Sequence, residues 1–204
     1  MTGMEENGMG NRHEITRADI MDMEAYGEIR RARRVEIGAI KKDRRVEVGP
    51  FAAFYFENYD TMWYQIHEML YIEKGGEAQI ADELGAYNPL VPNGAELVTT
   101  LMFEIEDEDR RKRELGRLGG VEGRVSLSVG GETIGAIAET DVERSKPDGR
   151  TSSVHFLHFP FTPAQVASFR TQRARVVLAI GHENYAHMAA LPERVRVALA
   201  ADFD

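Results

Sequence analysis

The sequence predicts an α+β fold, a single domain built on a mostly antiparallel sheet of about six or seven strands. Helices are expected to pack on one face of this sheet and at its ends. Three observations support this fold class. Short apolar stretches alternate with turn residues, helical periodicity occurs at both ends of the chain, and one β-hairpin signal is clear. The 204 residues, 43% of them hydrophobic, provide enough apolar material for one core.

The N-terminal region is expected to contain a tail and then a long helix. Residues 1–14 are rich in Gly, Asn, Met and Glu and lack an apolar signal segment, so they predict a disordered tail. Thr16 and Asp19 resemble a capping box, and apolar residues at loosely helical spacing follow them. One long N-terminal helix is therefore expected from this box to about Lys42. The folded domain is expected to span residues 15–204.

The elements after this helix follow from apolar alternation, capping residues and turn-forming glycines, prolines and asparagines. The expected strands are residues 45–48, 51–57, 96–106, 125–129, 134–138, 153–161 and 175–180. The expected helices are residues 61–74, 77–86, 107–118, 163–171 and 191–201. The segment after the last strand, residues 181–187, is interpreted as an exposed polar loop.

The clearest of these signals is the hairpin. Apolar residues alternate over 125–129, Gly130-Gly131 supplies a two-residue turn, and the alternation resumes at Ile134. Together with the strand at 153–161, three successive strands are expected to form an antiparallel meander.

The segment from the strand at 51–57 into the next helix is the best candidate for a functional site. On a helical projection, Gln65 and Glu68 share a narrow polar stripe on a helix that is otherwise largely apolar. With Glu57 and Asn58 just before the helix, they predict a small polar pocket for a cation, an ammonium or guanidinium group, or a metal. The alternative is a structural network, in which Glu57 or Glu68 pairs with an arginine of the first helix and Gln65 bonds to strand backbone.

Two histidine-based sites are less well supported by the sequence. His67 lies on a different sector of the helix from Glu68, because adjacent helical residues point about 100° apart, so no dyad is expected. His155 and His158 face opposite sides of their strand and cannot chelate one ion together. His155 is expected to reach the polar pocket, although a lone strand histidine is more often a structural residue. The predicted ligands of a divalent iron, manganese or zinc ion are Glu57, Glu68 and His155.

Composition excludes several classes of function. Cysteine is absent, which rules out disulfides, thiolate metal sites and cysteine nucleophiles. A net charge of −9 argues against nucleic-acid binding, which needs a basic surface. No run of 18 apolar residues occurs, so no membrane span is expected, and the cytoplasm is the expected location.

One segment is basic, although the chain as a whole is acidic. Arg30, Arg31, Arg33 and Arg34 follow one another in the first predicted helix. The first interpretation is a solvated helix face. The second is a docking surface for an acidic partner or a phosphate-bearing ligand.

The chain resembles the bacterial family described as domain of unknown function 3501, over roughly residues 15–202. The segments that carry the resemblance are Phe56-Glu57-Asn58, Asp60-Thr61, Gln65-Ile66, Glu68-Met69-Leu70, residues 87–92, residues 100–105 and residues 154–157. This family has no established activity. Its genes often look associated with rubrerythrin-like and iron–sulfur oxidoreductase proteins, which implies an accessory role in peroxide- or iron-linked redox metabolism.

These observations lead to three functional hypotheses. The first is a cytoplasmic, non-catalytic accessory protein that presents its basic helix to a redox partner and holds a ligand or metal near Glu57, Gln65 and Glu68. The second is a metal-dependent oxidoreductase or hydrolase that uses this pocket together with His155. The third is a structural subunit that forms a homo-oligomer through its sheet edge.

Overall fold

The computed structural model describes residues 12–139 and 150–204 and confirms the α+β class. The five-stranded sheet consists, in spatial order, of β1 (Arg45–Val48), β2 (Ala52–Glu57), β3 (Glu96–Phe103), β7 (Val154–Pro160) and β6 (Ile137–Ala138). The four-stranded sheet consists of β5 (Glu132–Gly135), β4 (Val125–Val129), β8 (Val177–His182) and β9 (Tyr185–Ala190). The helices are α1 (Met23–Lys42), α2 (Tyr59–Glu73), α3 (Gly76–Tyr87), α4 (Glu108–Leu115), α5 (Pro163–Arg170) and α6 (Glu193–Ala200).

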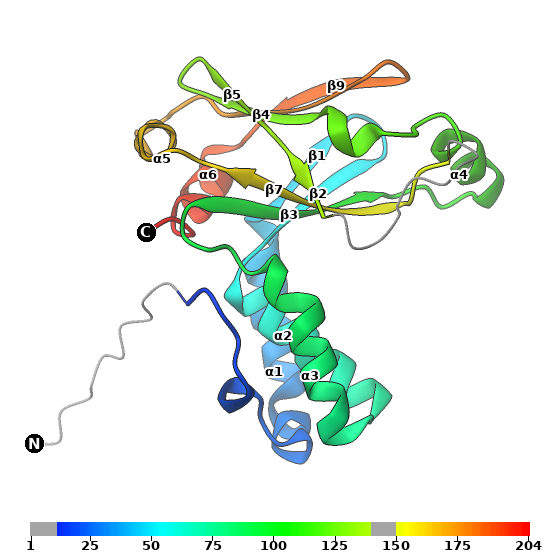
Figure 1. Cartoon of the computed structure of the whole chain (residues 1–204), viewed down its shortest axis with the longest axis vertical. Helices are drawn as coiled ribbons and strands as arrows, with labels where there is room; N and C mark the ends of the chain where they lie inside the picture. Colours follow the sequence, from blue (N-terminus) through cyan, green and yellow to red (C-terminus); the bar gives the residue numbers. More distant parts are fainter. Residues whose placement is uncertain (1–11, 140–149) are drawn as a thin grey trace, which may run out of the picture.

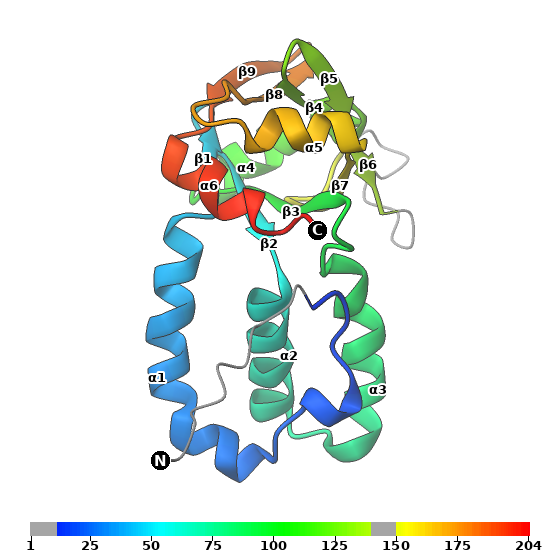
Figure 2. The ribbon, with the colours of Figure 1, turned by 90° about the vertical axis from the view of Figure 1, so that its left-hand side faces the viewer.

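The two sheets form layers at one end of the molecule, and α1, α2 and α3 form an arm that projects from them (Figure 1). Within the arm, α2 lies between α1 and α3 (Figure 2). Each of the two parts has its own apolar core. Phe54, Leu101 and Leu127 belong to the core between the sheets, whereas Tyr26 and Ile66 belong to the core of the arm. Within the described residues, no helix combines the length and apolar character needed to cross a bilayer.

The long N-terminal helix is present, but its expected start at the Thr16 capping box is wrong. The box closes only the short 3-10 turn η1 (Arg17–Asp19), and α1 begins at Met23 after the N-cap Asp22. The reason lies in the connecting backbone. The carbonyl of Asp19 accepts a hydrogen bond from the Trp63 indole (2.9 Å), and the amide of Met21 donates to His67 (3.1 Å). These side chains bind peptide groups that a continuous helix would use internally.

The hairpin is confirmed, with Val129 opposite Glu132 across the Gly130-Gly131 turn. Both glycines have positive φ, the conformation that a two-residue turn of this kind requires. The three successive segments also pair in the expected order. However, the second segment bends at Ala136, so that β5 pairs with β4 in one sheet and β6 pairs with β7 in the other. The strands therefore form two sheets connected by one shared segment.

The prediction of a polar loop at residues 181–187 is wrong. Residues 185–190 form β9, which pairs with β8 through a tight turn. Most of β9 is exposed, so it lacks the apolar alternation by which a strand is identified in sequence.

Tyr185, at the start of β9, connects the two sheets. Its hydroxyl donates to the carbonyl of Val48 (2.7 Å) and accepts from the amides of Phe51 (3.2 Å) and Ala52 (3.0 Å). Gly49 allows this contact, since its φ is +74° and a Cβ there would lie 2.6 Å from the tyrosine oxygen. The turn between β1 and β2 is thus fixed by a side chain of the other sheet.

Tyr185→Phe is expected to lower the free energy of unfolding by about 1–3 kcal/mol, because it leaves buried backbone groups without a partner. Urea unfolding followed by circular dichroism measures this loss. Tyr87→Phe is the matched control, since the Tyr87 hydroxyl makes no hydrogen bond within the described residues. Equal stability of the two variants would contradict this role for Tyr185.

Candidate functional site

Asn58 caps α2, which begins at Tyr59. Its side-chain oxygen accepts from the amide of Thr61 (3.0 Å), and the Thr61 hydroxyl accepts from the amide of Asn58 (3.0 Å). The helix therefore begins earlier than expected. As a consequence, Tyr59 and Asp60 belong to the first turn of α2 and not to the preceding loop.

Glu57 is a buried structural acceptor at the end of β2, with 6% of its surface exposed. One carboxylate oxygen accepts from the hydroxyl of Thr61 (2.7 Å) and the other from the hydroxyl of Thr100 (2.7 Å). Both oxygens are thus engaged by protein donors, but these donors are threonine hydroxyls and not an arginine of the first helix.

Glu68 forms the ion pair with the first helix that the structural alternative predicted. Its two oxygens accept from Nε and Nη2 of Arg30, both at 2.8 Å, and Oε1 also accepts from the Tyr26 hydroxyl (2.8 Å). The hydrogen bonds from Arg30 hold the pKa of Glu68 below its ordinary value. Glu68 lies nine residues into α2, about 14 Å along the helix axis. Glu57 and Glu68 therefore do not share a site.

Gln65 is half-buried on α2 between these two carboxylates. Within the described residues its side chain makes no hydrogen bond, so the expected bond to strand backbone is not formed. The polar stripe is thus two separate networks with an amide between them.

His155 lies on the opposite face of the five-stranded sheet from Glu57. It pairs with Leu101 in the register and is fully buried toward the second sheet. Its Nε2 is 3.1 Å from the Thr151 hydroxyl and 3.0 Å from the Ser152 carbonyl. The structure therefore does not bring His155 to either Glu57 or Glu68.

The histidine on the face of Glu57 is His158, because Glu57 pairs with Val98 and Val98 pairs with His158. Its Nδ1 is 3.0 Å from Glu96 and its Nε2 is 3.4 Å from Glu139. The bond to Glu96 is the main cause that raises the pKa of His158. Among the described residues, no three His, Asp or Glu side chains are grouped so as to hold a metal ion.

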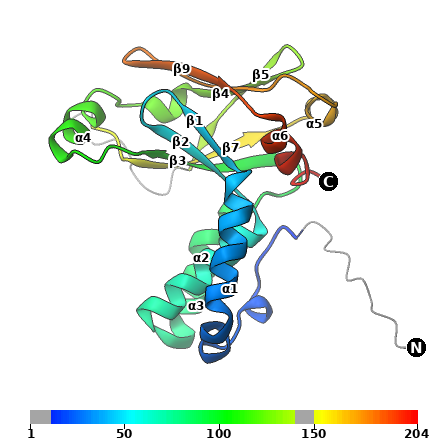
Figure 3. The same cartoon turned by 180° about the vertical axis from the view of Figure 1, so that it is seen from behind.

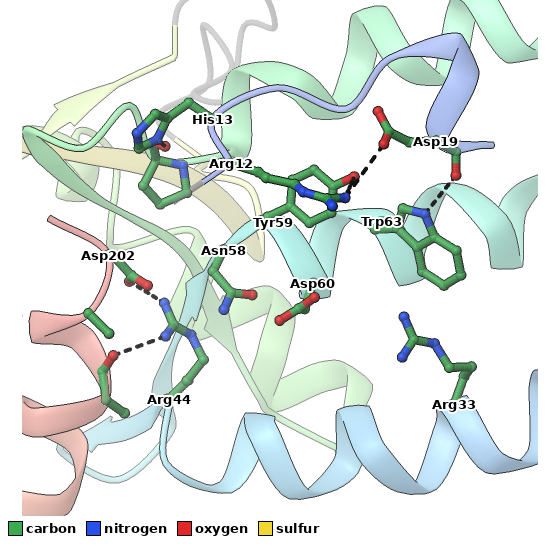
Figure 4. A pocket seen from close by; sticks show the side chains of 13 residues that line it. Arg12, His13, Asp19, Arg33, Arg44, Asn58, Tyr59, Asp60, Trp63 and Asp202 are labelled. Atoms are coloured by element: carbon green, nitrogen blue, oxygen red, sulfur yellow. Dashed lines mark hydrogen bonds and ion pairs between the residues drawn. The ribbon is translucent and has the colours of Figure 1, made fainter. Parts of the chain in front are cut away.

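A concave site lies at the root of the arm (Figure 4). It is a cleft of about 610 Å³ between α1, the start of α2, the end of α6 and the segment at residues 12–13. The lining residues are Arg12, His13, Asp19, Arg33, Arg44, Asn58, Tyr59, Asp60, Trp63, Pro92, Ala198, Ala201 and Asp202. Of the residues singled out from the sequence, Asn58 and Arg33 line it. We call it the root cleft.

One end of the root cleft is closed by a buried ion pair. Arg44 and Asp202 are 4% and 7% exposed, and the guanidinium donates to the carboxylate. Arg44 also donates to the carbonyls of Phe56 (2.9 Å) and Glu57 (3.0 Å). Burial raises the pKa of Asp202, although the charge of Arg44 opposes this shift. The two residues are 158 positions apart, and neither has a local sequence signal.

The other end is formed by Trp63, the only tryptophan of the chain. One face of its indole lies against the ring of His67, with centroids 3.7 Å apart, and the guanidinium carbon of Arg33 lies 4.6 Å from its ring centroid. His67 accepts from the amide of Met21 through Nε2, so Nδ1 carries the proton donated to the Trp63 carbonyl (2.7 Å). Burial lowers the pKa of His67. This histidine is a structural support for the indole.

Asp60 lies between these two ends, with Asn58 beside it (Figure 4). Its half-buried carboxylate forms no hydrogen bond or ion pair within residues 12–139 and 150–204, and it interacts with the charge of Arg12 only by a longer-range attraction. Arg33 uses Nη1 to bind Glu36 (2.8 Å), and Arg12 lies near the Tyr59 hydroxyl (3.4 Å). The root cleft thus has an unpaired acid at its centre and guanidinium groups on its walls.

The N-terminal segment contributes to this site. Residues 1–11 of the expected tail lie outside the described residues. His13 is 2.7 Å from the carbonyl of Pro92 through Nδ1 and 3.0 Å from the Asp204 carboxylate through Nε2. These contacts hold the segment beside the cleft.

The basic segment of α1 divides into two sets. Arg30 and Arg33 point into the arm, toward Glu68 and Trp63. Arg31 and Arg34 are exposed on the surface. Arg30 and Arg33 thus have structural roles within the arm. The four arginines therefore do not form one docking surface.

Comparison with known proteins shows the family of the chain and a similar crystal structure. The model of the family described as protein of unknown function (DUF3501) matches residues 14–203. A crystal structure of a novel protein of unknown function from Burkholderia pseudomallei K96243, at 1.90 Å resolution, is similar with a TM-score of 0.86. The two sequences are 40% identical, over 93% of this chain and 99% of that chain. No curated protein matches.

Glu68→Gln is expected to lower stability at pH 7, and this loss is expected to shrink in acid. The folded pKa of Glu68 lies below the ordinary 4.5, so its contribution is complete above pH 4.5 and disappears as the pH falls through the folded pKa. Urea unfolding of both proteins across this range measures the difference. Glu106→Gln, at an exposed position, is the control. A difference from wild type that does not change with pH would contradict the assignment.

The rings of His67 and His158 are expected to titrate on opposite sides of 6.5, the ordinary histidine pKa. His158 therefore stabilises the fold below pH 6.5, and this contribution is lost as the pH rises through its folded pKa. His67 favours the fold above pH 6.5 and opposes it progressively below. Two-dimensional NMR of the imidazole nitrogens, assigned with single His→Gln variants, measures both values. The reverse order would be incompatible with the described contacts.

Proposed function

The chain belongs to the DUF3501 family, and we propose that it is an accessory protein that binds a small zwitterionic molecule in the root cleft. The observation that carries this proposal is the unpaired carboxylate of Asp60 in a cleft whose walls carry Arg12 and Arg33. Binding, and not chemical conversion, is the proposed activity. The redox setting implied by the family resemblance, with a redox protein as partner, is part of the same proposal.

The size of the root cleft supports a small ligand. Its volume of about 610 Å³ lies within the range of roughly 300–1,000 Å³ that is usual for small-molecule sites. Such sites have mainly apolar walls with a few polar groups that fix the orientation of the ligand. Trp63, Tyr59 and Ala201 supply apolar surface here, and Asp60 and Asn58 supply polar groups.

The charges of the lining support a ligand with both signs. A carboxylate without a partner is a natural acceptor for an ammonium group, because a charge-assisted hydrogen bond is stronger than a neutral one. Arg33 and Arg12 can donate to a carboxylate or phosphate, since each still has guanidinium nitrogens without a hydrogen bond in the described residues. Because Arg44 is neutralised by Asp202, it adds little net charge.

The hydrogen bonds next to the cleft favour binding over catalysis. His13 lines the cleft, but its ring nitrogens contact the Pro92 carbonyl and the Asp204 carboxylate. His67, behind Trp63, has both of its ring nitrogens engaged with backbone groups. The Tyr59 hydroxyl lies beside a guanidinium group that is also near Asp19. These groups have fixed structural partners and are poorly placed to transfer a proton to a ligand.

Calorimetry and the fluorescence of Trp63 test the proposal. Amino acids, the matching amines and the matching carboxylates form the test panel. The zwitterions are expected to bind and to change the Trp63 emission, because Arg33 lies over the indole. The singly charged analogues are expected to bind more weakly.

Asp60→Asn is expected to weaken zwitterion binding by about 10- to 100-fold, which corresponds to the loss of one charge-assisted hydrogen bond. Asp109→Asn, at an exposed position on α4, is the matched control. Arg33→Gln is expected to weaken the binding of the zwitterions and of the carboxylates, but not the binding of the simple amines. Unchanged affinity in Asp60→Asn, or binding by none of the panel, would refute the proposal.

A further inference from the structure

We infer that the outer face of α1 pairs, in antiparallel orientation, with α1 of a second copy of this chain. Helix α1 lies at the outside of the arm (Figure 3). Of its 20 residues, only Tyr26 and Ile37 are fully buried. Tyr26 belongs to the core of the arm, and Ile37 lies on the same sector of the helix, so the opposite side of α1 has no partner within the described chain.

This outer side carries a seam of heptad spacing. Its six positions are Ala25, Glu28, Ala32, Val35, Ala39 and Lys42, and all six are exposed. They are separated by alternate steps of three and four residues, the spacing of a helix that packs lengthwise on another helix. On a helical projection they lie within about 100° of one another, away from the buried side. Four of the six positions are apolar (Ala25, Ala32, Val35 and Ala39), and the other two, Glu28 and Lys42, are charged.

The side chains of the seam suit close helix–helix contact. Val35 is 71% exposed and is the largest apolar side chain of the seam. Three alanines recur at seven-residue intervals along the seam and leave room for a neighbouring backbone. Gly38 adds space beside it, because a Cβ at this position would meet no atom within 4 Å.

The charges select the partner and its orientation. Glu24 and Glu28 lie at the first end of α1, and Lys42 lies at the last end. A parallel pair would place these like charges opposite each other, whereas an antiparallel pair places the acids of each copy near Lys42 of the other. A second copy of the chain is the partner that fits both ends.

The spacing also sets the register. With Ala32 of one copy opposite Val35 of the other, the two-fold axis lies between residues 33 and 34. Glu28 then faces Ala39, and Ala25 faces Lys42. Every position of the seam therefore has a counterpart.

The expected dimer is weak and depends on concentration. A helix of 20 residues is about 30 Å long and about 10 Å wide, so the footprint is roughly 300 Å² on each copy. The two copies together would bury roughly 600 Å², which lies below the roughly 1,200 Å² that stable interfaces bury in total. Arg33 points to the other side of α1, so pairing leaves the root cleft open and does not depend on the proposed ligand.

Sedimentation equilibrium over a wide range of protein concentration tests the pairing. The full chain is expected to change reversibly from monomer to dimer. Val35→Glu is expected to raise the dissociation constant at least tenfold. Ile72→Glu, at a 62% exposed apolar residue on α2, is the matched control and should leave it unchanged. A monomer at every concentration, or equal effects of the two variants, would overturn the inference.

A charge exchange tests the orientation. Lys42→Glu alone is expected to weaken the dimer, because each glutamate then lies near the acids of the other copy. Adding Glu24→Lys and Glu28→Lys in the same chain is expected to restore it. Failure of the triple variant to recover, while circular dichroism shows an unchanged fold, would contradict the antiparallel arrangement.

Cysteine cross-linking tests the register, because the natural chain contains no cysteine. Under mild oxidation, Ala32→Cys, close to the two-fold axis, is expected to form a disulfide-linked dimer. Ala25→Cys is far from its own symmetry mate and is expected to remain monomeric. Mixing Ala25→Cys with Lys42→Cys should give a heterodimer. Efficient linkage of Ala25→Cys to itself would indicate a parallel pair and overturn the inference.

Discussion

The buried guanidinium of Arg44 joins the helical arm to the sheets. Arg44 lies in the short connection between α1 and β1, and its hydrogen bonds reach the carbonyls of Phe56 and Glu57, immediately before α2. The exit of one arm helix and the entry of the next are thus held by one side chain. Asp202 neutralises its charge from the C-terminal segment. A buried charge that loses its partner costs about 3–5 kcal/mol, so the position of the arm depends on this pair.

The same arrangement accounts for the root cleft. The core of the arm includes Val98 of β3 and packs against Phe156 of β7, so it reaches the face of the five-stranded sheet, but this apolar packing does not fill the part of the junction beside α6. What remains there is a space bordered by charged side chains, several of which already have partners. Trp63 and the residues around it form the inner end of this space, and the Arg44–Asp202 pair forms the outer end. The cleft is therefore a product of how two separate cores are joined.

Local features could be predicted from the sequence, and long-range features could not. The hairpin at Gly130-Gly131 depends on residues within a few positions of each other, and it is present. The resemblance to DUF3501 was likewise carried by short segments and is confirmed. The strand β9 was missed because its exposed residues do not alternate. The partnership of Arg44 and Asp202, and hence the cleft between them, depends on packing over 158 positions that leaves no local pattern.

The segment at residues 132–138 has a consequence for the way the protein opens. Because it supplies strands to both sheets, and because Tyr185 connects them again, neither sheet can lose its hydrogen bonds without disturbing the other. The sheets therefore constitute one cooperative unit. The arm, with a separate core and a single buried ion pair at its root, is a second unit that can open while the sheets stay folded. In amide hydrogen exchange, the two units would differ as blocks: slow exchange shared by both sheets, and faster exchange shared by α1, α2 and α3.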